Sequence, residues 1–244
     1  MIQDRPSGGK AVARTDHSSV VLIETFINYE RKYYCAGVLI SSNFALTTAR
    51  CVIGAIFANI HVNAFKFSDI HEEKREIHRA TEFIFKEPFD RYINHNDIAL
   101  VKLPVTLNLA VKTYSVAKLP TSDMPVNSVG KSVGWGLYDF YDNDEYTTEE
   151  KNEIDLQFIS ENDCKAAYGA RINETNIGRA GRGCLKKLAG SNCVSGYGSP
   201  FFIGDTVYAL HSFGAYQYCT SDLPNGVTLI ESYHLEWIKE NSDV

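Results

Sequence analysis

The sequence contains no apolar run that approaches the roughly 20 residues a membrane-spanning helix requires. Residues 1–5 lack the apolar stretch of a secretory signal, so we expect a mature chain behind an added methionine. Internal repeats and low-complexity tracts are also missing, which excludes solenoid and fibrous classes. The formal net charge is only −6 over 244 residues, so no overall cationic field favours nucleic acid. We expect no nucleic-acid partner and no membrane span.

Metal-binding motifs are scarce as well. The sequence has no CxxC pair, and His71 and His78 flank residues 72–76 without the HExxH spacing of a zinc hydrolase. Six cysteines are scattered along the chain and suit three disulfides better than a zinc site, although the sequence alone leaves 15 connectivities open. Such cysteine usage is typical of an oxidising, extracellular compartment. We therefore expect a secreted protein with no metal and no cofactor.

Many short runs rich in β-branched and aromatic residues are separated by Gly, Asn, Asp and Pro. Examples are residues 20–23, 36–40, 97–103 and 206–210. This spacing predicts an all-β fold. One long helix is predicted at residues 231–241, where Tyr233 and Trp237 lie four apart between polar residues. A short helix is predicted after Ser160, whose hydroxyl can cap it.

The sequence contains a series of short motifs. Each motif alone is weak evidence for a family because short motifs recur by chance, but their order along the chain is strong evidence. They are Cys35-Ala36-Gly37, Thr47-Thr48-Ala49-Arg50-Cys51, Asp97-Ile98-Ala99-Leu100, Gly134-Trp135-Gly136, Ser195-Gly196-Tyr197-Gly198-Ser199-Pro200 and Ser212-Phe213-Gly214. The chain resembles the chymotrypsin/trypsin-like serine proteases over nearly its whole length. Within that family it resembles the inactivated serine protease paralogues of the scabies mite, in which triad substitutions abolish activity.

The resemblance implies two six-stranded antiparallel β-barrels followed by a C-terminal α-helix. Residues 104–125 look like the crossing between the barrels. We expect a single trypsin-like domain over residues 1–244, with barrels at about 10–115 and 116–230. It also implies the disulfides Cys35–Cys51, Cys164–Cys184 and Cys193–Cys219. The first closes a loop of about 15 residues, worth roughly 3 kcal/mol in the chain-entropy model.

Two of the three triad positions have changed. Arg50 stands where the family has its general base and Tyr197 where it has its nucleophile, while Asp97 remains. A guanidinium with a pKa above about 12 keeps its proton in a protein. We expect Arg50 to fill the gap through a bidentate ion pair with Asp97, the alternative being a side chain that points to solvent. Tyr197 is expected over the substrate pocket or hydrogen-bonded nearby.

The features that set the oxyanion hole are also altered. Active relatives pair a newly cut N-terminus with an aspartate just before the nucleophile, and that residue is Gly196 here. The matching N-terminal segment reads Arg5-Pro6-Ser7-Gly8-Gly9, and an Arg–Pro bond resists trypsin-like cleavage. Ser195 adds a side chain where the family has a glycine. We therefore expect no catalytic residues in this chain.

A remnant of the substrate pocket is expected from the same resemblance. Ser191 falls at its base, and its walls match Gly214 and Gly226 beside Ser212 and Phe213. We interpret the adjacent His211 as a core or wall histidine rather than a displaced base. Some relatives hold calcium in the loop around residue 76 through carboxylates; Glu76 is a candidate ligand, but Lys74 and Arg75 oppose a bound cation.

The sequence also contains a glycosylation motif and two charged segments that are expected at the surface. Asn173-Glu174-Thr175 is an N-glycosylation sequon. Residues 139–153 carry seven carboxylates against one lysine, and residues 171–187 carry five cations against one carboxylate. Such runs are usually solvated loops, and the alternative is that they contact a charged protein partner.

The resulting hypothesis is a secreted, catalytically inactive serine protease homologue that binds other proteins. The resemblance to the mite paralogues implies host proteins, complement components among them, as partners. One alternative is a hydrolase that uses Tyr197 or Ser199. Another is a decoy that sequesters protease inhibitors or substrates, which requires an open pocket.

Overall fold

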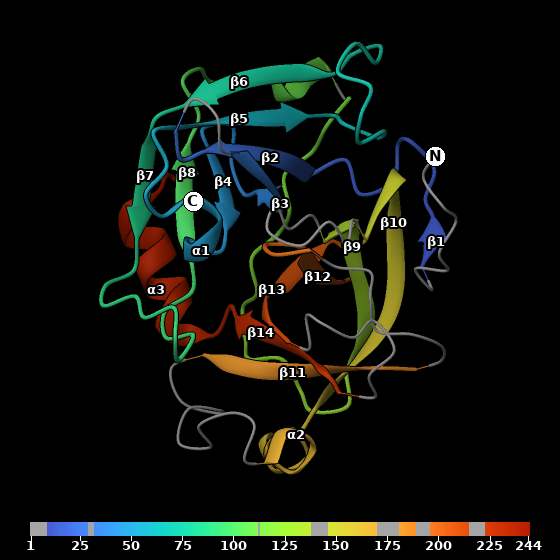
Figure 1. Ribbon diagram of the computed structural model, residues 1–244, viewed down its shortest axis with the longest axis vertical. Coiled ribbons are helices and arrows are strands. Elements are labelled where there is room, and N and C mark those ends of the chain that lie inside the picture. Colours follow the sequence, from blue (N-terminus) through green and yellow to red (C-terminus); the bar gives the residue numbers. More distant parts are fainter. Residues whose placement is uncertain are drawn as a thin grey trace.

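The computed structural model describes residues 9–28, 32–111, 113–137, 146–169, 181–188, 196–214 and 223–244. Two antiparallel β-sheets of seven described strands each form the molecule (Figure 1). Short strands dominate because apolar and β-branched residues alternate or cluster over only a few positions between turns. No helix among the described residues has the length and apolar character to cross a membrane.

The first sheet is curled, with the strand order β6-β5-β2-β3-β4-β8-β7. Its elements are β2 (Val20–Phe26), β3 (Lys32–Leu39), β4 (Phe44–Thr47), β5 (Phe57–Val62), β6 (Glu76–Ala80), β7 (Glu82–Phe85) and β8 (Ala99–Lys102), with the short helix α1 (Ala49–Val52) after β4. Alternate residues of β2 such as Val21 and Ile23 lie inside the curl with residues of β3, β5 and β8. The sheet therefore encloses a core of its own.

The second sheet closes on itself because β9 pairs with both β10 and β12. Its strands are β9 (Val129–Leu137), β10 (Tyr146–Ile159), β11 (Arg182–Lys187), β12 (Pro200–Ile203), β13 (Thr206–Phe213) and β14 (Asn225–Leu229). A short strand, β1 (Lys10–Ala11), adds to the edge of β10, and the 3₁₀ turn η1 (Leu109–Val111) lies between the two sheets in the sequence. The result is a six-stranded barrel with one added edge strand.

The two predicted helices are present at the positions expected for them. In α2 (Glu161–Tyr168), the Oγ of Ser160 accepts a hydrogen bond from the backbone N–H of Asp163 at 3.1 Å, as the predicted cap requires. The terminal helix α3 (Ser232–Asn241) differs from the predicted range by one residue at its start. Its buried Trp237 and Ile238 join the core between the sheets.

The all-β class with a C-terminal helix is confirmed. The second sheet forms the six-stranded barrel that was expected, whereas the first is a curled sheet of seven strands whose edge strands, β6 and β7, do not pair in the part of the chain described. Val20 and Leu22 of the first sheet share one apolar cluster with Val133, Trp135 and Leu210 of the second. This shared core fixes the two sheets against each other. The single domain over residues 1–244 and its division near residue 115 stay predictions.

Two disulfides tie local segments together. Cys35 and Cys51 join β3 to α1 with their Cα atoms 6.0 Å apart, and Cys164 and Cys184 join α2 to β11 at 5.7 Å. These are two of the three pairs that the family resemblance implied. Cys193 lies outside the described residues, as does its expected partner.

The loop between β5 and β6 is organised around the buried side chain of Arg75. Its Nη1 donates hydrogen bonds to the backbone oxygens of Lys66 at 2.7 Å and Asp69 at 2.8 Å. Glu76, the candidate calcium ligand, instead accepts a hydrogen bond from the ring of His78 at 3.0 Å. The carbonyl groups that face the inside of this loop are therefore bound to a cation of the chain itself.

Candidate functional site

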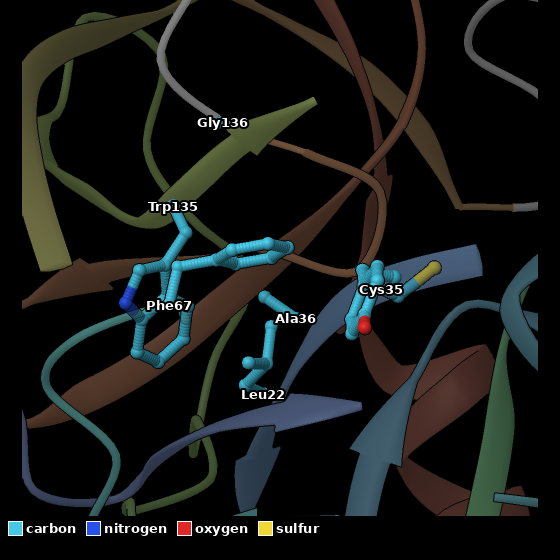
Figure 2. Close-up of a pocket in the computed structure, with 7 residues that line it drawn as sticks. Leu22, Cys35, Ala36, Phe67, Trp135 and Gly136 are labelled. Carbon is cyan, nitrogen blue, oxygen red and sulfur yellow. The ribbon is translucent and has the colours of Figure 1, made fainter. Parts of the chain in front are cut away.

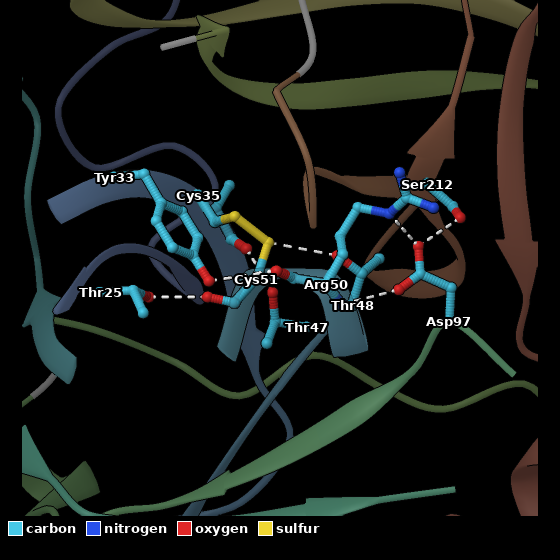
Figure 3. The surroundings of a disulfide bond; sticks show 10 residues. Thr25, Tyr33, Cys35, Thr47, Thr48, Arg50, Cys51, Asp97 and Ser212 are labelled. Carbon is cyan, nitrogen blue, oxygen red and sulfur yellow. Dashed lines mark hydrogen bonds and ion pairs between the residues drawn. A yellow bond between two sulfur atoms is a disulfide. The ribbon is translucent and has the colours of Figure 1, made fainter. Parts of the chain in front are cut away.

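The three triad positions come from both sheets and meet where the sheets face each other. Arg50 lies on α1, directly after β4, and Asp97 precedes β8. Tyr197 precedes β12, and Ser212 lies in β13 of the barrel. Figure 3 shows Arg50 and Ser212 converging on the carboxylate of Asp97.

Asp97 is fully buried, and both of its carboxylate oxygens accept hydrogen bonds. Oδ2 accepts from Nε of Arg50 at 2.5 Å and from Oγ of Ser212 at 2.6 Å, while Oδ1 accepts from the backbone N–H of Arg50 at 2.9 Å (Figure 3). The expected ion pair is therefore present, but it is not the expected bidentate fork. Only Nε reaches Asp97, because Nη2 donates to Oδ1 of Asn94.

The guanidinium of Arg50 is mostly shielded from solvent, with 16% of the side chain exposed. Burial by itself lowers the pKa of Arg50, but the charges of Asp97 and Tyr197 and their hydrogen bonds outweigh burial and hold the pKa above its ordinary value. A group that stays protonated throughout the accessible pH range accepts no proton from a nucleophile. Arg50 therefore neutralises Asp97 and cannot act as a general base.

Tyr197 lies against the same guanidinium. Its half-buried ring has its centroid 4.7 Å from Cζ of Arg50, within the range of a cation–π interaction. The ring of His211 lies on another side, 6.3 Å between centroids. The backbone oxygen of Tyr197 accepts a hydrogen bond from the N–H of Ala36 at 2.9 Å, which ties this turn to β3. The ring of Tyr197 thus lies close to both Arg50 and His211.

His211 is buried, in agreement with its interpretation as a core or wall histidine. Burial, assisted by the charge of Arg50, lowers its pKa to about 3. Its Nδ1 makes no hydrogen bond within the described residues. The imidazole is therefore neutral at physiological pH and is a poor proton acceptor.

An aromatic side chain packs on one of the two glycines that were expected to line the substrate pocket. A Cβ atom on Gly226 would lie only 2.2 Å from the ring of Phe213, so this ring occupies the space that Gly226 leaves open. The ring of Tyr168 lies 6.1 Å from that of Phe213, and a Cβ on Gly214 would lie 3.8 Å from the backbone N of Gly226. The sequence analysis expected Tyr197 over this pocket or hydrogen-bonded nearby, and it did not predict the packing of Phe213 on Gly226. Ser191 and Ser195 lie outside the described residues.

The turn that carries Tyr197 is closely packed on its far side. Gly198 has φ +73°, and a Cβ there would lie 2.1 Å from the backbone oxygen of Ala36, so only glycine fits. Gly196 is buried, and its oxygen accepts from the N–H of Ser199 at 3.1 Å. The hydroxyl of Ser199 has no partner in the described part of the chain and packs against Gly134 of β9. It is 1% exposed and so is not presented to a substrate.

A recess opens beside Ala36, where the two sheets meet (Figure 2). Its walls include the rings of Tyr34, Phe67 and Trp135, and Figure 2 shows Trp135 and Phe67 on one side of the opening. The indole N–H of Trp135 is bonded to a backbone oxygen at 2.8 Å and does not face a ligand. None of the described residues that line the recess is charged, so they are suited to contact with apolar groups rather than to catalysis.

Two buried histidines predict acid sensitivity. Burial lowers the pKa of His211 to about 3 and that of His234 to about 4. An unfolded histidine has a pKa near 6.5, so below about pH 6.5 the unfolded chain binds protons that the folded chain does not. We expect stability to be complete above about pH 6.5 and to fall as the pH drops towards 4, by up to about 1.4 kcal/mol per pH unit for each histidine.

Urea unfolding at pH 7, 6 and 5 measures this effect. His211→Leu is expected to reduce the slope of the unfolding free energy against pH by the contribution of one histidine. The apolar side chain also removes the buried Nδ1 that has no hydrogen-bond partner in the described residues. His71→Gln, at an exposed position, is the matched control and is expected to leave the slope unchanged. A wild-type slope of zero between pH 6.5 and 5 would contradict the prediction.

Comparison with known proteins shows the family to which the chain belongs. The Trypsin family model matches residues 7–238. The chain belongs to the trypsin family. Brachyurin of Leptuca pugilator is 30% identical to it over 213 residues, which cover 87% of this chain and 89% of brachyurin. A chymotrypsin of Phaedon cochleariae is 26% identical over 219 residues, covering 88% of this chain and 74% of that protein.

Solved structures show the same fold. A scabies mite inactivated protease paralogue, S-D1, superposes with a TM-score of 0.80 at 20% identity and 96% coverage of both chains. HL collagenase superposes with a TM-score of 0.79 at 21% identity and the same coverage. Trypsin-family membership together with disulfides is typical of secreted proteins. This trypsin-family chain thus keeps the fold while two of its three triad positions hold other residue types.

Proposed function

We propose that the protein is a catalytically inactive serine protease homologue that acts as a secreted protein-binding module and inhibits host complement. The observation that carries the first part is the hydrogen bonding of Asp97. In a working triad this carboxylate orients a histidine that takes the nucleophile's proton. Here both of its oxygens are bound to Arg50, a group that keeps its proton. The proton path of acyl transfer is missing.

The energetic consequence is large. Loss of triad members in working serine proteases costs up to about 10⁶-fold in turnover, about 8 kcal/mol of barrier. The oxyanion hole alone retains about 10³ to 10⁴ over water, and Gly196 removes the aspartate that the family uses to set it. Binding is then the function left to a scaffold of this size.

Neither alternative function has comparable support. A hydrolase that uses Tyr197 needs a base, and the neighbouring His211 is buried with its pKa lowered to about 3. A hydrolase that uses Ser199 needs an exposed hydroxyl, and that hydroxyl is buried. A decoy for inhibitors or substrates needs an open pocket, whereas Phe213 fills the space over Gly226.

The choice of complement as the target rests on the likeness to the mite paralogues. The proposal also includes three surface features of this chain. Residues 139–153 and 171–187 are proposed contact patches of opposite charge, and large parts of both lie outside the described residues. The sequon at Asn173 also lies outside them. Secretion places the protein where complement acts.

The test combines two measurements on the purified protein. We expect no adduct with a fluorophosphonate probe and no hydrolysis of peptide substrates, while an active trypsin run in parallel shows both. In normal serum we expect a dose-dependent fall in complement-mediated lysis of sensitised erythrocytes. An adduct on Tyr197 or Ser199 would overturn the inactive assignment. Unchanged lysis at saturating dose would reject complement as the target.

A further inference from the structure

One loop projects a nearly bare aromatic side chain. Between β7 and β8, Tyr92 is 89% exposed, more than any other large hydrophobic side chain among the described residues. Ile70 and Leu188, the next, are each 51% exposed. Arg91, beside Tyr92, is also exposed. Soluble proteins usually keep a tyrosine ring partly covered, so this exposure calls for a physical explanation.

The loop that carries Tyr92 has a defined internal structure. Asp90 and His95 exchange two backbone hydrogen bonds, each 3.0 Å long. Oδ1 of Asp90 accepts further bonds from the backbone N–H of Tyr92 at 2.8 Å and of Ile93 at 3.3 Å. The side-chain amide of Asn96 donates to the oxygen of Pro88 at 3.1 Å. Both the base and the tip of the loop are therefore fixed.

Two arginines attach this loop to the rest of the molecule. Arg182 of β11, in the barrel, donates to the backbone oxygen of Ile93. Arg50 donates through Nη2 to Oδ1 of Asn94 while its Nε holds Asp97. The residue that replaced the catalytic base thus joins the buried carboxylate to the loop. The loop is attached to both sheets.

The charged side chains of the loop differ in their contacts. The carboxylates of Glu87 and Asp90 accept hydrogen bonds from backbone N–H groups of the loop itself. The side chain of Arg91 has no ion-pair or hydrogen-bond partner among the described residues. The tip therefore presents an exposed phenol ring and a guanidinium that makes no ion pair among the described residues.

We propose that residues 88–96 form a recognition loop for a partner protein. The ring of Tyr92 inserts into a pocket on the partner, and Arg91 pairs with a carboxylate at the rim of that pocket. Tyrosine and arginine are among the residue types that dominate binding energy at protein interfaces. A loop already held in place loses little conformational entropy on binding. This inference rests on the proposed binding function and names the surface that performs it.

A protein partner suits the loop better than a polyanion. A single cation beside a tyrosine can pair with one carboxylate of a partner protein. Binding to a phosphate backbone or an anionic lipid surface needs several cations together. The chain as a whole carries a formal net charge of −6, which repels polyanions.

The role of Arg50 is tested first, without any partner. Asn94 has φ +54°, so Asn94→Gly removes the acceptor of Arg50 without backbone strain, while Asn94→Asp keeps an acceptor. We expect amide hydrogen exchange at Tyr92 and Ile93 to accelerate about tenfold or more in Asn94→Gly. Asn94→Asp should match the wild type. Equal exchange in all three proteins would overturn the attachment by Arg50.

Binding is tested with normal serum in the lysis assay. Tyr92→Ala and Arg91→Ala are each expected to raise the dose for half-maximal protection about tenfold or more. Val126→Ala, an exposed apolar control in another part of the chain, is expected to leave it unchanged. Full protection by Tyr92→Ala and Arg91→Ala, with the wild type active, would overturn the recognition loop and leave the proposed function standing.

A second readout separates the two proposals if the wild type does not protect. A benzophenone amino acid at position 92, or at position 126 as control, is irradiated in whole serum. A discrete adduct that forms at position 92, is absent at position 126 and is lost with Arg91→Ala supports the loop with a partner outside complement. Absence of an adduct at position 92 overturns it.

Discussion

Asp97→Ala is expected to lower the free energy of unfolding by about 3–5 kcal/mol, the cost of removing one partner of a buried ion pair. The variant leaves the guanidinium of Arg50, only 16% exposed, without its carboxylate. It also leaves the hydroxyl of Ser212 without its acceptor. In an active protease this aspartate serves catalysis, whereas under the proposed function we expect its main effect on stability. Urea unfolding with intact disulfides gives the value.

A double-mutant cycle separates the ion pair from general packing loss. Arg50→Met removes the charge and keeps much of the apolar volume, and the double variant Asp97→Ala/Arg50→Met removes both charges. Replacing both members of a buried pair is often close to neutral, because the desolvation cost of both charges disappears as well. We therefore expect the double variant to be more stable than Asp97→Ala alone. Strict additivity of the two single effects would contradict the pairing.

The parts of the fold that could be predicted from the sequence depend on local interactions or on the order of motifs along the chain. Short β-rich runs between turn residues indicate the all-β class, and Ser160 identifies the start of α2 because a cap is a local interaction. The apolar spacing of Tyr233 and Trp237 predicted α3 to within one residue at its start. The strand count of the first sheet was less accessible, since pairing of β6 with β5 and of β7 with β8 depends on contacts across long loops.

The site was predicted in its identities and less well in its contacts. The sequence favoured an ion pair of Arg50 with Asp97 over an arginine that points to solvent, and the structure contains the ion pair. The fork was wrong because Asn94 competes for the second nitrogen, and no local pattern links residues 44 positions apart. The packing of the Phe213 ring on Gly226 was not predicted, because it depends on the pairing of β13 with β14.

The double variant Arg50→His/Tyr197→Ser restores the residue types of the triad and is nevertheless expected to be nearly inactive. We expect its kcat/KM on peptide substrates to stay about 10³-fold or more below that of an active trypsin-family enzyme, since one lost oxyanion donor alone costs about 10²–10³. Gly196 cannot provide the aspartate that pairs with a new N-terminus, and Pro6 opposes the cut that makes one.

The pocket adds a second, independent obstacle. The ring of Phe213 packs on Gly226 and takes up space that a substrate side chain would use. Adding Phe213→Ala to the double variant opens that space, yet activity should remain low because the oxyanion donors are still unset. Hydrolysis of peptides that carry alanine, phenylalanine or arginine before the cleaved bond, followed in parallel with fluorophosphonate labelling of the hydroxyl introduced at position 197, measures both effects. Brisk turnover by the double variant would show that the two triad substitutions alone, and not the rest of the scaffold, account for the proposed inactivity.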